Sequence, residues 1–570
     1  MTSLKTLTLL ALTALLATGC HPGGEQTADD TKANPLLAYV PADTPFVFAN
    51  LETAPPAVMD AWLKRLEPLA KVGEQSLADV RSELANVQDP EQQAGIDLFL
   101  AISDEIAGKL NRDGLESMGL SLESNSAIYG NGLFPVVRLG LKDAAALRAT
   151  IERIQAKSGV TAEERQFNGA SYWRLGEDPV AVYVAILADH VAIGVTPPSL
   201  EADFLPAFLG QALPEHSLGA AGTLSALNKA EGYSGFGSGF IDLNRVADEL
   251  LNPASYTATR LNTAFGYDAS QTSPVCAAEY RAIVAHAPRA SAGVTELTGN
   301  SLGMRYRVKI EENLADQLAR LVADIPKASA AGDAVFSLSL GIEVGRLREF
   351  LLDKFTTAAA TPFQCPRLAR LNQGIQAAAD RLNQPMPPFI GNFRGVRVEL
   401  NDFDFKNFDP AKSTGLLAIE VENPEILTGM ASMFVPGMED LDLHPGGEPV
   451  QVPQELLSMV TPDFQVRAMM TSDALGVSLG KDESGKLLPF MQLKGSDDGT
   501  FLSMEYDLAA LAEAQNSFEG LAGVGGPEAE AWRTHHEALV KAYQSMLGRT
   551  RMEFRFTDEG LVVDSHTAFP

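Results

Sequence analysis

The feature that most constrains the fold is an order of predicted elements that occurs twice in the 570 residues. The first copy opens with an apolar strand at residues 46–52 and continues with helical sequence to about residue 111. The second copy opens with a strand at residues 334–340, and helical sequence follows from residue 344 to about residue 382. A chain that repeats its element order is expected to fold each copy into the same kind of unit.

Each copy then shows a hairpin that leads into a helix. The predicted hairpin strands are residues 119–123 and 135–143 in the first copy, and residues 395–400 and 416–423 in the second. Their alternation of apolar and polar residues predicts strands with one buried face.

The sequence also marks where the helices after these hairpins begin. Asp143 and Asn423 end the hairpins, and both residue types are common N-caps. Pro424 then stands at the first helical position, where its missing N–H leaves no hydrogen bond unmade.

A further pair of matching segments follows. We predict one strand at residues 185–195 and its counterpart at residues 468–477. A Leu-Pro pair comes after each strand, at residues 205–206 and 488–489.

Together these elements predict an α+β protein made of two copies of one unit. Each unit is expected to be an antiparallel sheet of hairpins and meanders with helices packed on one face. We place the first unit at residues 37–325 and the second at residues 326–570.

The N-terminal sequence resembles a bacterial lipoprotein signal peptide. Lys5 supplies the positive region, residues 7–16 form an apolar core, and the small-residue sequence ATGC ends at Cys20. The apolar core is shorter than the ~20 residues that a membrane-spanning helix needs. We therefore expect a signal peptide at residues 1–19 and acyl chains on Cys20, and the alternative is an ordinary secretory signal.

The residues after Cys20 indicate a location. His21 stands where Asp usually retains such lipoproteins in the inner membrane, so the resemblance implies the periplasmic side of the outer membrane. Residues 20–36 are polar and contain Gly and Pro, which is typical of a flexible tether. The expected membrane contact is therefore through the acyl chains on Cys20.

The charge of the chain argues against one class of partner. Its formal net charge is −29, and such a surface repels phosphate backbones. We expect no nucleic-acid partner.

Residues 39–52 read YVPADTPFVFANLE, and the strand, helix and hairpin order described above follows them. This opening resembles an uncharacterised bacterial family of secreted proteins and lipoproteins, known as a domain of unknown function. The resemblance covers most of the mature chain and implies no activity, cofactor or catalytic residue.

Two cysteines remain once Cys20 is set aside. Cys276 and Cys365 would lie in an oxidising compartment, where a single disulfide between them is expected. Two separate thiols are the alternative, because a sequence does not show whether the two Cα atoms approach closely enough.

Motifs for chemistry are weak in this chain. Residues 299–303 read GNSLG and match the nucleophile-elbow pattern, but a strand rather than a helix follows, so a hairpin turn is the better interpretation. Asp402, Asp404 and Asp409 are weak candidates for calcium, and a polar hairpin loop is the alternative. We predict no cofactor and no metal centre.

Three classes of function are left open. The first is a non-catalytic lipoprotein that binds or scaffolds an envelope protein. The second is a carrier whose apolar ligand lies in a cavity between the units or against a sheet, lined from residues 136–141 and 417–421. The third is a hydrolase whose site no linear motif reveals.

Overall fold

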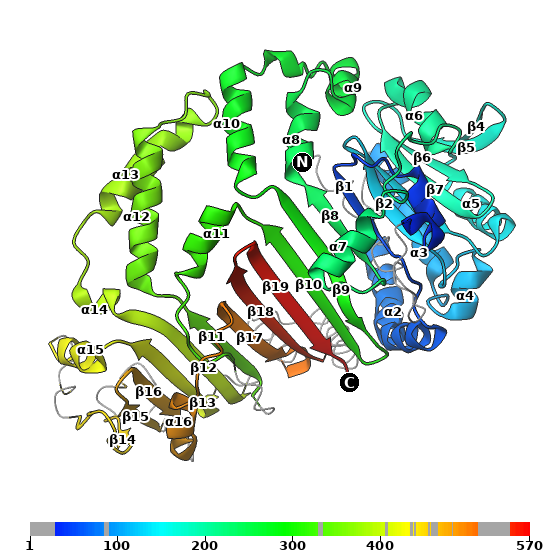
Figure 1. Ribbon diagram of the computed structural model, residues 1–570. Coiled ribbons are helices and arrows are strands. Elements are labelled where there is room, and N and C mark those ends of the chain that lie inside the picture. Colours follow the sequence, from blue (N-terminus) through cyan, green and yellow to red (C-terminus); the bar gives the residue numbers. More distant parts are fainter. Residues whose placement is uncertain are drawn as a thin grey trace. The chain divides into compact units, whose positions relative to one another are not determined.

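The computed structural model describes residues 29–84, 90–328, 334–404, 409–433, 437, 441–453, 457, 465–480, 483–510 and 548–570. The chain divides into two compact units, Met1–Tyr306 and Arg307–Pro570 (Figure 1). The sequence-based boundary, between residues 325 and 326, lies beyond this division. Both units combine helices with antiparallel strands, so the predicted α+β class is confirmed.

Unit 1 is built on one sheet. Its strands are β1 Phe46–Ala49, β2 Ser126–Asn131, β3 Phe134–Gly140, β4 Glu163–Phe167, β5 Ala170–Leu175, β6 Ala181–Ile186, β7 His190–Thr196, β8 Ser238–Asp242, β9 Arg289–Leu297 and β10 Ser301–Lys309. They lie in the order β10-β9-β8-β1-β2-β3-β7-β6-β5-β4, and neighbours from β9 to β4 are antiparallel.

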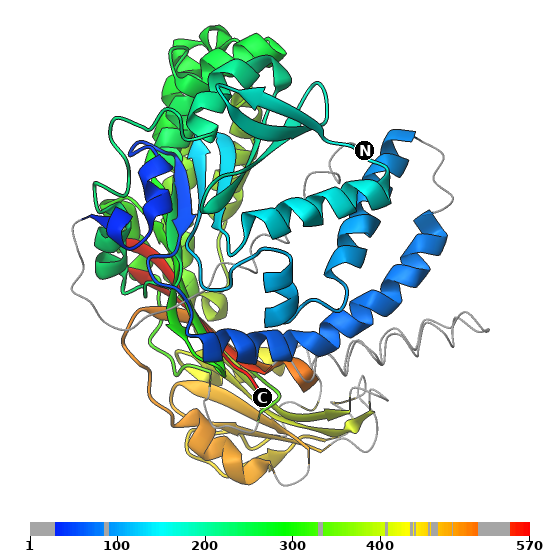
Figure 2. The ribbon, with the colours of Figure 1, turned by 90° about the vertical axis from the view of Figure 1, so that its right-hand side faces the viewer.

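The helices of unit 1 connect these strands. They are α2 Pro56–Leu84, α3 Pro90–Ile106, α4 Arg112–Ser117, α5 Ala144–Ser158, α6 Glu201–Phe208, α7 Thr223–Glu231, α8 Leu243–Leu251, α9 Tyr256–Phe265 and α10 Pro274–Ala285. Among them, α3 lies against both α2 and α5 (Figure 2).

Helices cover both faces of this sheet, so the expectation of helices on one face is wrong. On one face, α6 lies so close to Gly194 of β7 that an added β-carbon would stand 2.5 Å from Phe204 Cζ. On the other face, the Arg148 guanidinium of α5 lies 4.5 Å from the centre of the Trp173 ring of β5. The sequence pattern missed this because most strands of unit 1 are apolar on both faces and therefore carry little alternation.

Two strand predictions in unit 1 are corrected. Residues 119–123 form turns around one isolated antiparallel bridge, between Leu120 and Leu141, and the strand follows at Ser126–Asn131. Residues 185–195 form parts of two strands, β6 and β7, with the exposed Asp189 in the turn between them. Apolar residues on both sides of so short a turn concealed it from the sequence pattern.

The predicted helix starts are partly confirmed. The Asp143 side chain accepts hydrogen bonds from the backbone N–H groups of Ala145 and Ala146 and caps α5. Asn423 has a φ of +56° and makes no capping hydrogen bond through its side chain, although Pro424 begins the helix as expected.

Residues 29–36, which the sequence assigns to the tether, fold onto unit 1. The buried Asp30 carboxylate accepts hydrogen bonds from the backbone N–H groups of Leu224 and Ser225. The buried Asn34 amide donates to the carbonyl oxygens of Asn50 and Ser126. Residues 29–36 therefore belong to the folded unit 1.

Unit 2 is built on a second set of strands. These are β11 Phe336–Gly341, β12 Phe393–Asp404, β13 Asp409–Val421, β14 Val450–Gln451, β15 Val466–Met470, β16 Ala474–Leu479, β17 Thr500–Asp507, β18 Arg549–Thr557 and β19 Gly560–Ala568. They pair antiparallel in the order β19-β18-β17-β11-β12-β13-β16-β15-β14. The predicted strand at residues 468–477 is again a hairpin, formed by β15 and β16.

The described helices of unit 2 are α11 Glu312–Ala319, α12 Val344–Ala360, α13 Asn372–Leu382, α14 Pro388–Gly391, α15 Pro424–Ala431 and α16 Ser484–Met491. Of these, α12 packs against α13, and α16 packs against β16. No helix within the described ranges of either unit has both the length and the apolar character needed to cross a membrane.

The two sheets have the same strand order around their first strands. In unit 1 the order is β8-β1-β2-β3-β7-β6-β5, and in unit 2 it is β17-β11-β12-β13-β16-β15-β14. The helix with the Leu-Pro pair packs on the corresponding strand in each unit, α6 on β7 and α16 on β16. Each of these strands has a glycine beneath the helix, Gly194 or Gly476.

We expect Gly194→Val to destabilise unit 1 by about 2 kcal/mol, because the new side chain overlaps Phe204 and Phe208 in a packed core. Gly374→Ala is a suitable control, because Gly374 lies in α13 with no atom within 4 Å of an added β-carbon. Helix propensity predicts that this control is stabilised by up to about 1 kcal/mol. Thermal unfolding of both variants tests the close approach of α6, which would be contradicted by an unchanged midpoint for Gly194→Val.

Candidate functional site

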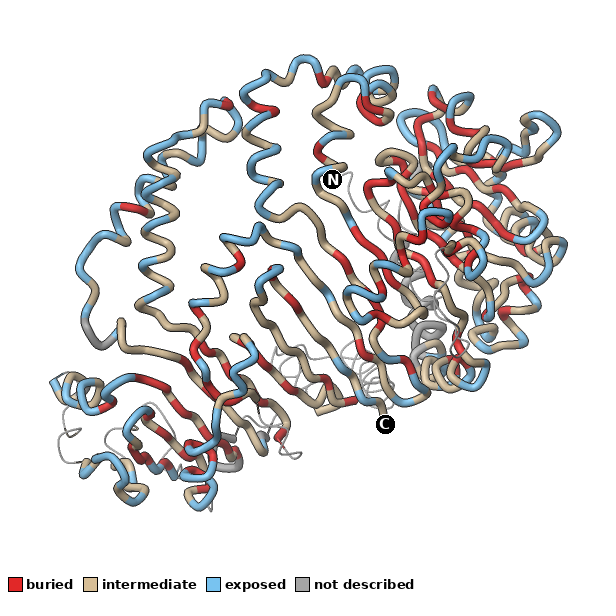
Figure 3. Tube along the Cα trace, viewed as in Figure 1, coloured by how far each residue is buried: buried red, intermediate tan, exposed pale blue. Residues whose placement is uncertain are grey.

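Around β11 and β17, the sheet of unit 2 is polar on its buried face and apolar on the other. Directly paired residues of an antiparallel sheet point to the same side, so the strand pairings identify the members of each face. Along β11, for example, Ser337 and Ser339 are buried, whereas Leu338 and Leu340 are half-buried. Figure 3 shows buried and half-buried segments along the strands of both units. Burial therefore alternates along β11 in the opposite sense to hydrophobicity.

We call the half-buried side the apolar face of unit 2. It runs across β18, β17, β11, β12, β13 and β16, and every position of its two central rows is apolar. The first row is Met552, Met504, Leu338, Val398, Leu417 and Val477, and the second is Phe554, Leu502, Leu340, Val396, Ile419 and Leu475. Each of these side chains is neither fully buried nor fully exposed.

The opposite face contains buried polar groups, several of which are satisfied within the unit, whereas the Ser337 hydroxyl has no hydrogen-bond partner among the described residues. Ser503 Oγ accepts a hydrogen bond from Ala328 N at 2.6 Å, and Ser339 Oγ donates to Pro326 O at 2.5 Å. The Glu505 carboxylate, which is 4% exposed, accepts from Arg551 Nη2 at 2.8 Å. These contacts explain how serine and glutamate side chains are buried here without a large desolvation penalty.

The corresponding face of unit 1 is also apolar. Its central row contains Phe48, Ile128, Val137, Ile193 and Val184, of which Val137 is buried and the others are half-buried. The opposite face of this sheet is part of a fully buried core, with Tyr129, Val136 and Tyr183 among its members. Unit 2 also buries an apolar cluster on the corresponding face, beneath α16, beside the buried Ser337, Ser339 and Glu505.

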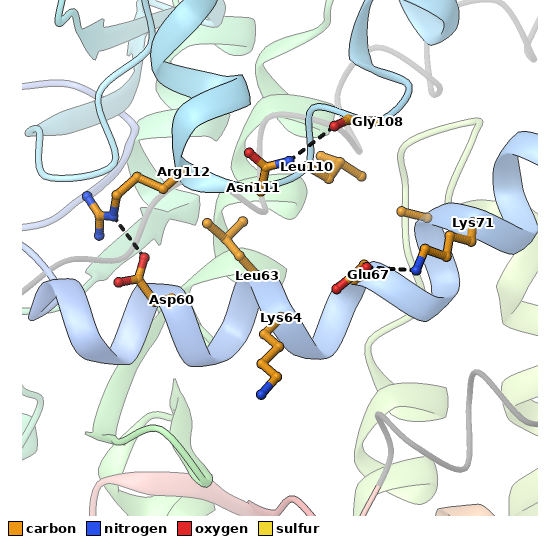
Figure 4. Close-up of a pocket in the computed structure, with 10 residues that line it drawn as sticks. Asp60, Leu63, Lys64, Glu67, Lys71, Gly108, Leu110, Asn111 and Arg112 are labelled. Atoms are coloured by element: carbon orange, nitrogen blue, oxygen red, sulfur yellow. Dashed lines mark hydrogen bonds and ion pairs between the residues drawn. The ribbon is translucent and has the colours of Figure 1, made fainter.

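Unit 1 also contains a small cavity of about 420 Å³ beside α2 (Figure 4). Leu63 points toward Leu110 across this cavity, and Lys64 points away to the other side of α2. The charged groups on its wall are paired: Arg112 Nε lies 2.8 Å from Asp60 Oδ1, and Lys71 Nζ lies 2.7 Å from Glu67 Oε1. With these charges already neutralised, the wall offers a ligand little electrostatic attraction.

A buried arginine holds the end of α6 in unit 1. Arg138 of β3 is 0% exposed, and its Nη2 donates to the carbonyl oxygens of Ala207 at 3.2 Å and Phe208 at 2.9 Å. The carbonyl groups at a helix C-terminus carry a partial negative charge, so a guanidinium is favourable there. Its Nε donates to the Tyr129 hydroxyl, and its Nη1 contacts His190 Nε2 at 2.7 Å.

A buried arginine also holds the end of α16 in unit 2. Arg397 of β12 is 2% exposed, and its Nη1 donates to the Phe490 carbonyl oxygen at 2.7 Å. Its Nε donates to Glu420 Oε1 at 2.8 Å, so a carboxylate neutralises this guanidinium directly. Burial raises the pKa of Glu420, and the charge of Arg397 opposes that effect.

The cysteines singled out from the sequence are not part of the apolar face or of the two arginine contacts. Cys20 lies outside the described residues. Cys276 begins α10 in unit 1 and is 9% exposed, whereas Cys365 is fully buried in unit 2. Their pairing remains a prediction.

The weak calcium candidates lie on two paired strands. Asp402 and Asp404 belong to β12 and Asp409 to β13, and the backbones of Asp404 and Asp409 are directly paired. The strands therefore extend into the stretch that was interpreted as a loop. Among the residues that the structure describes, no group of three or more His, Cys, Asp or Glu side chains is arranged to hold a metal ion.

The GNSLG segment forms the hairpin turn that the sequence predicts. It connects β9 with β10, and Ser301 is the first residue of β10. The Ser301 hydroxyl donates to Glu296 Oε1 at 2.5 Å and lies 2.7 Å from Thr298 Oγ1. These contacts belong to the hairpin and not to a nucleophile elbow.

Comparison with known proteins gives no further guide to the site. No family model, curated protein or solved structure matches the chain. The function is therefore argued from the geometry of the two units.

We expect Glu420→Gln to destabilise unit 2 by about 3 kcal/mol, because it leaves the Arg397 guanidinium buried without a counter-charge. Glu425→Gln, on the exposed surface of α15, is the matched control and should change stability by less than about 0.5 kcal/mol. Hydrogen exchange of β13 peptides reports the stability of this region. Equal protection in the two variants would show that Arg397 does not depend on the carboxylate.

Proposed function

We propose that this chain is a non-catalytic, lipid-anchored binding protein of the bacterial envelope. The lipoprotein-like N-terminal sequence supports an anchor through acyl chains on Cys20, and His21 supports the periplasmic side of the outer membrane. In this proposal the folded units supply a binding surface and the anchor holds that surface near the membrane.

The observation that carries the proposal is the apolar face of unit 2. A solvated sheet face normally carries polar side chains, with apolar side chains on the buried face. Here the buried face holds Ser337, Ser339 and Glu505, while the two central rows of the other face are entirely apolar. Burial of apolar surface is favourable by about 25 cal/mol for every Å² removed from water, so this face favours an apolar occupant.

The burial of this face favours an apolar ligand over a protein partner. Its side chains are half-buried, and no member of the two central rows is fully exposed. A hydrocarbon chain is thin enough to reach such side chains, whereas a folded protein needs a broad accessible surface of about 800 Å². We therefore propose a carrier or sensor of a molecule with a hydrocarbon chain, and a scaffold for an envelope protein is the alternative outcome of the tests.

We further infer that the two units are copies of one ancestral unit. Three shared features support this: the strand order, the Leu-Pro helix, and the glycine beneath that helix. The arginine hydrogen bonds end on corresponding carbonyl groups, because Ala207 and Phe490 each directly follow the proline of the Leu-Pro pair. The apolar face in each unit would then be an inherited property.

The ligand proposal predicts binding of N-phenyl-1-naphthylamine, a small apolar fluorophore, to the purified mature chain. The triple variant Val396→Thr, Val398→Thr and Val477→Thr keeps the β-branched shape but adds three hydroxyl groups to the apolar face. Burying hydroxyl groups without partners is unfavourable, so the fluorophore should bind at least about tenfold more weakly. Fluorescence titration measures the change.

Val562→Thr is the matched control for this titration, because Val562 points to the opposite face of the same sheet. It should leave the affinity unchanged. Equal weakening by both variants, or the absence of saturable binding to the wild-type chain, would overturn the proposed apolar ligand. In that case, crosslinking on intact cells that recovers one defined envelope protein would favour the scaffold.

The anchor is tested separately. We expect Cys20→Ser to release the protein from the membrane fraction into the soluble periplasmic fraction, because the residue that receives the acyl chains is lost. Cell fractionation followed by immunoblotting measures this change. A variant that stays in the membrane fraction would contradict the anchor and leave the ligand proposal intact.

A further inference from the structure

His190 joins the buried Arg138 to the protein surface. The imidazole is 1% exposed, and its Nδ1 lies 2.7 Å from Asp189 Oδ1. Its Nε2 lies 2.7 Å from Arg138 Nη1. The Asp189 side chain is 75% exposed and gives the imidazole a connection to solvent.

These contacts specify the protonation state of the imidazole. Asp189 Oδ1 is an acceptor, so His190 Nδ1 carries the hydrogen and donates it. The Arg138 guanidinium has only donors, so His190 Nε2 must accept. Only the neutral imidazole with its hydrogen on Nδ1 satisfies both neighbours.

Protonation of His190 breaks this arrangement. A hydrogen on Nε2 would face the N–H group of Arg138 across a 2.7 Å gap, and two positive charges would meet in a buried site. Arg138 would then lose an acceptor and be repelled from its position. Because the same guanidinium holds the carbonyl groups of Ala207 and Phe208, the end of α6 would lose its contact with the sheet.

The other groups around the imidazole do not compensate for a second positive charge. The Tyr39 ring centre is 5.2 Å from that of His190, and the Tyr129 hydroxyl accepts from Arg138. Burial raises the pKa of Tyr129. The Arg138 guanidinium also lies 4.0 Å from the centre of the Tyr39 ring. Asp189 is the one carboxylate in contact with the imidazole among the described residues, and it faces the opposite nitrogen.

The beginning of α6 is held in a different way. Glu201 accepts hydrogen bonds from Arg165 and Arg174, both at 3.1 Å. The pKa of Glu201 is lowered: burial raises it, but the hydrogen bonds from Tyr172, Arg174 and Arg165 together lower it more. Mild acid therefore leaves the N-terminal end of α6 attached through Glu201, while it protonates His190 near the C-terminal end.

We propose that Arg138, His190 and Asp189 form an acid-sensitive latch that releases the C-terminal end of α6 when His190 takes up a proton. Unit 2 has no such latch at its Leu-Pro helix, because Glu420 neutralises Arg397 directly. The latch therefore makes the response of unit 1 to pH different from that of unit 2.

The direction of the pH effect follows from the pKa of His190. Burial lowers this pKa from its ordinary value of 6.5, and the charge of Arg138 lowers it further, while Asp189 acts in the opposite direction. The stability that neutral His190 contributes is complete above pH 6.5 and is lost as the pH falls toward the lowered pKa.

Hydrogen exchange of the full mature chain at pH 7.5 and pH 5.0 tests the latch, with protection factors corrected for the intrinsic pH dependence of exchange. In the wild-type chain, protection of the last turn of α6 should fall at least about tenfold at the lower pH. His190→Gln should abolish this change, because its amide donates to Asp189 and accepts from Arg138 at both pH values.

His216→Gln, an exposed substitution in the same unit, is the matched control and should behave as the wild type. Protection of α16 should be the same in all three chains at each pH. The proposal is overturned if wild-type α6 keeps its protection at pH 5.0, or if His190→Gln loses protection as the wild type does. Titration of the His190 ring protons by NMR in the wild-type chain checks the buried imidazole itself, because burial lowers its pKa below 6.5.

Discussion

The contact between a sheet arginine and the end of a helix is the interaction on which the core of each unit depends. An α-helix leaves its last carbonyl groups without intrahelical partners, and the last turns of α6 and α16 each contain a proline. A buried guanidinium supplies the missing donors from beneath. It also holds the helix over the glycine of the neighbouring strand. One arginine side chain therefore both donates to the helix-end carbonyl groups and keeps the helix close to the sheet.

The two units place this arginine on different strands. Aligning Gly194 with Gly476 through the strand pairings aligns Tyr129 with Arg397, and Arg138 with Glu420. The arginine therefore stands on β3 in unit 1 and on β12 in unit 2. The other of the two positions holds Tyr129 in unit 1 and Glu420 in unit 2. The guanidinium reaches the same turn of the helix from either position. What differs is its neutralisation, since a carboxylate contacts it in unit 2, while an imidazole separates it from a carboxylate in unit 1.

The sequence predicts the antiparallel units, the closing hairpin at residues 299–300 and the cap at Asp143 because each depends on local chemistry. It does not predict which face of β11 is buried. The alternation of Ser337 and Ser339 with Leu338 and Leu340 is plain in the sequence, and the ordinary rule assigns the leucines to the core. The structure buries the serines more deeply, because residues 326–328 lie across that face and pair with Ser339 and Ser503. Such a contact joins segments far apart in the chain, so no local pattern signals it.

The same reasoning explains why the candidate residues of the sequence and those of the structure differ. Motif searches find side chains close together in the chain, such as Asp402 and Asp404, whereas Arg138 and His190 come from β3 and β7 and meet only through strand pairing. A buried arginine inside a predicted strand is nevertheless a usable signal, because a charge on an apolar strand requires a partner. In unit 1 that partner is the imidazole of His190, and its protonation would place a second positive charge beside the Arg138 guanidinium. The physical need to satisfy a helix end thus creates, in unit 1, a core contact that depends on the protonation of an imidazole.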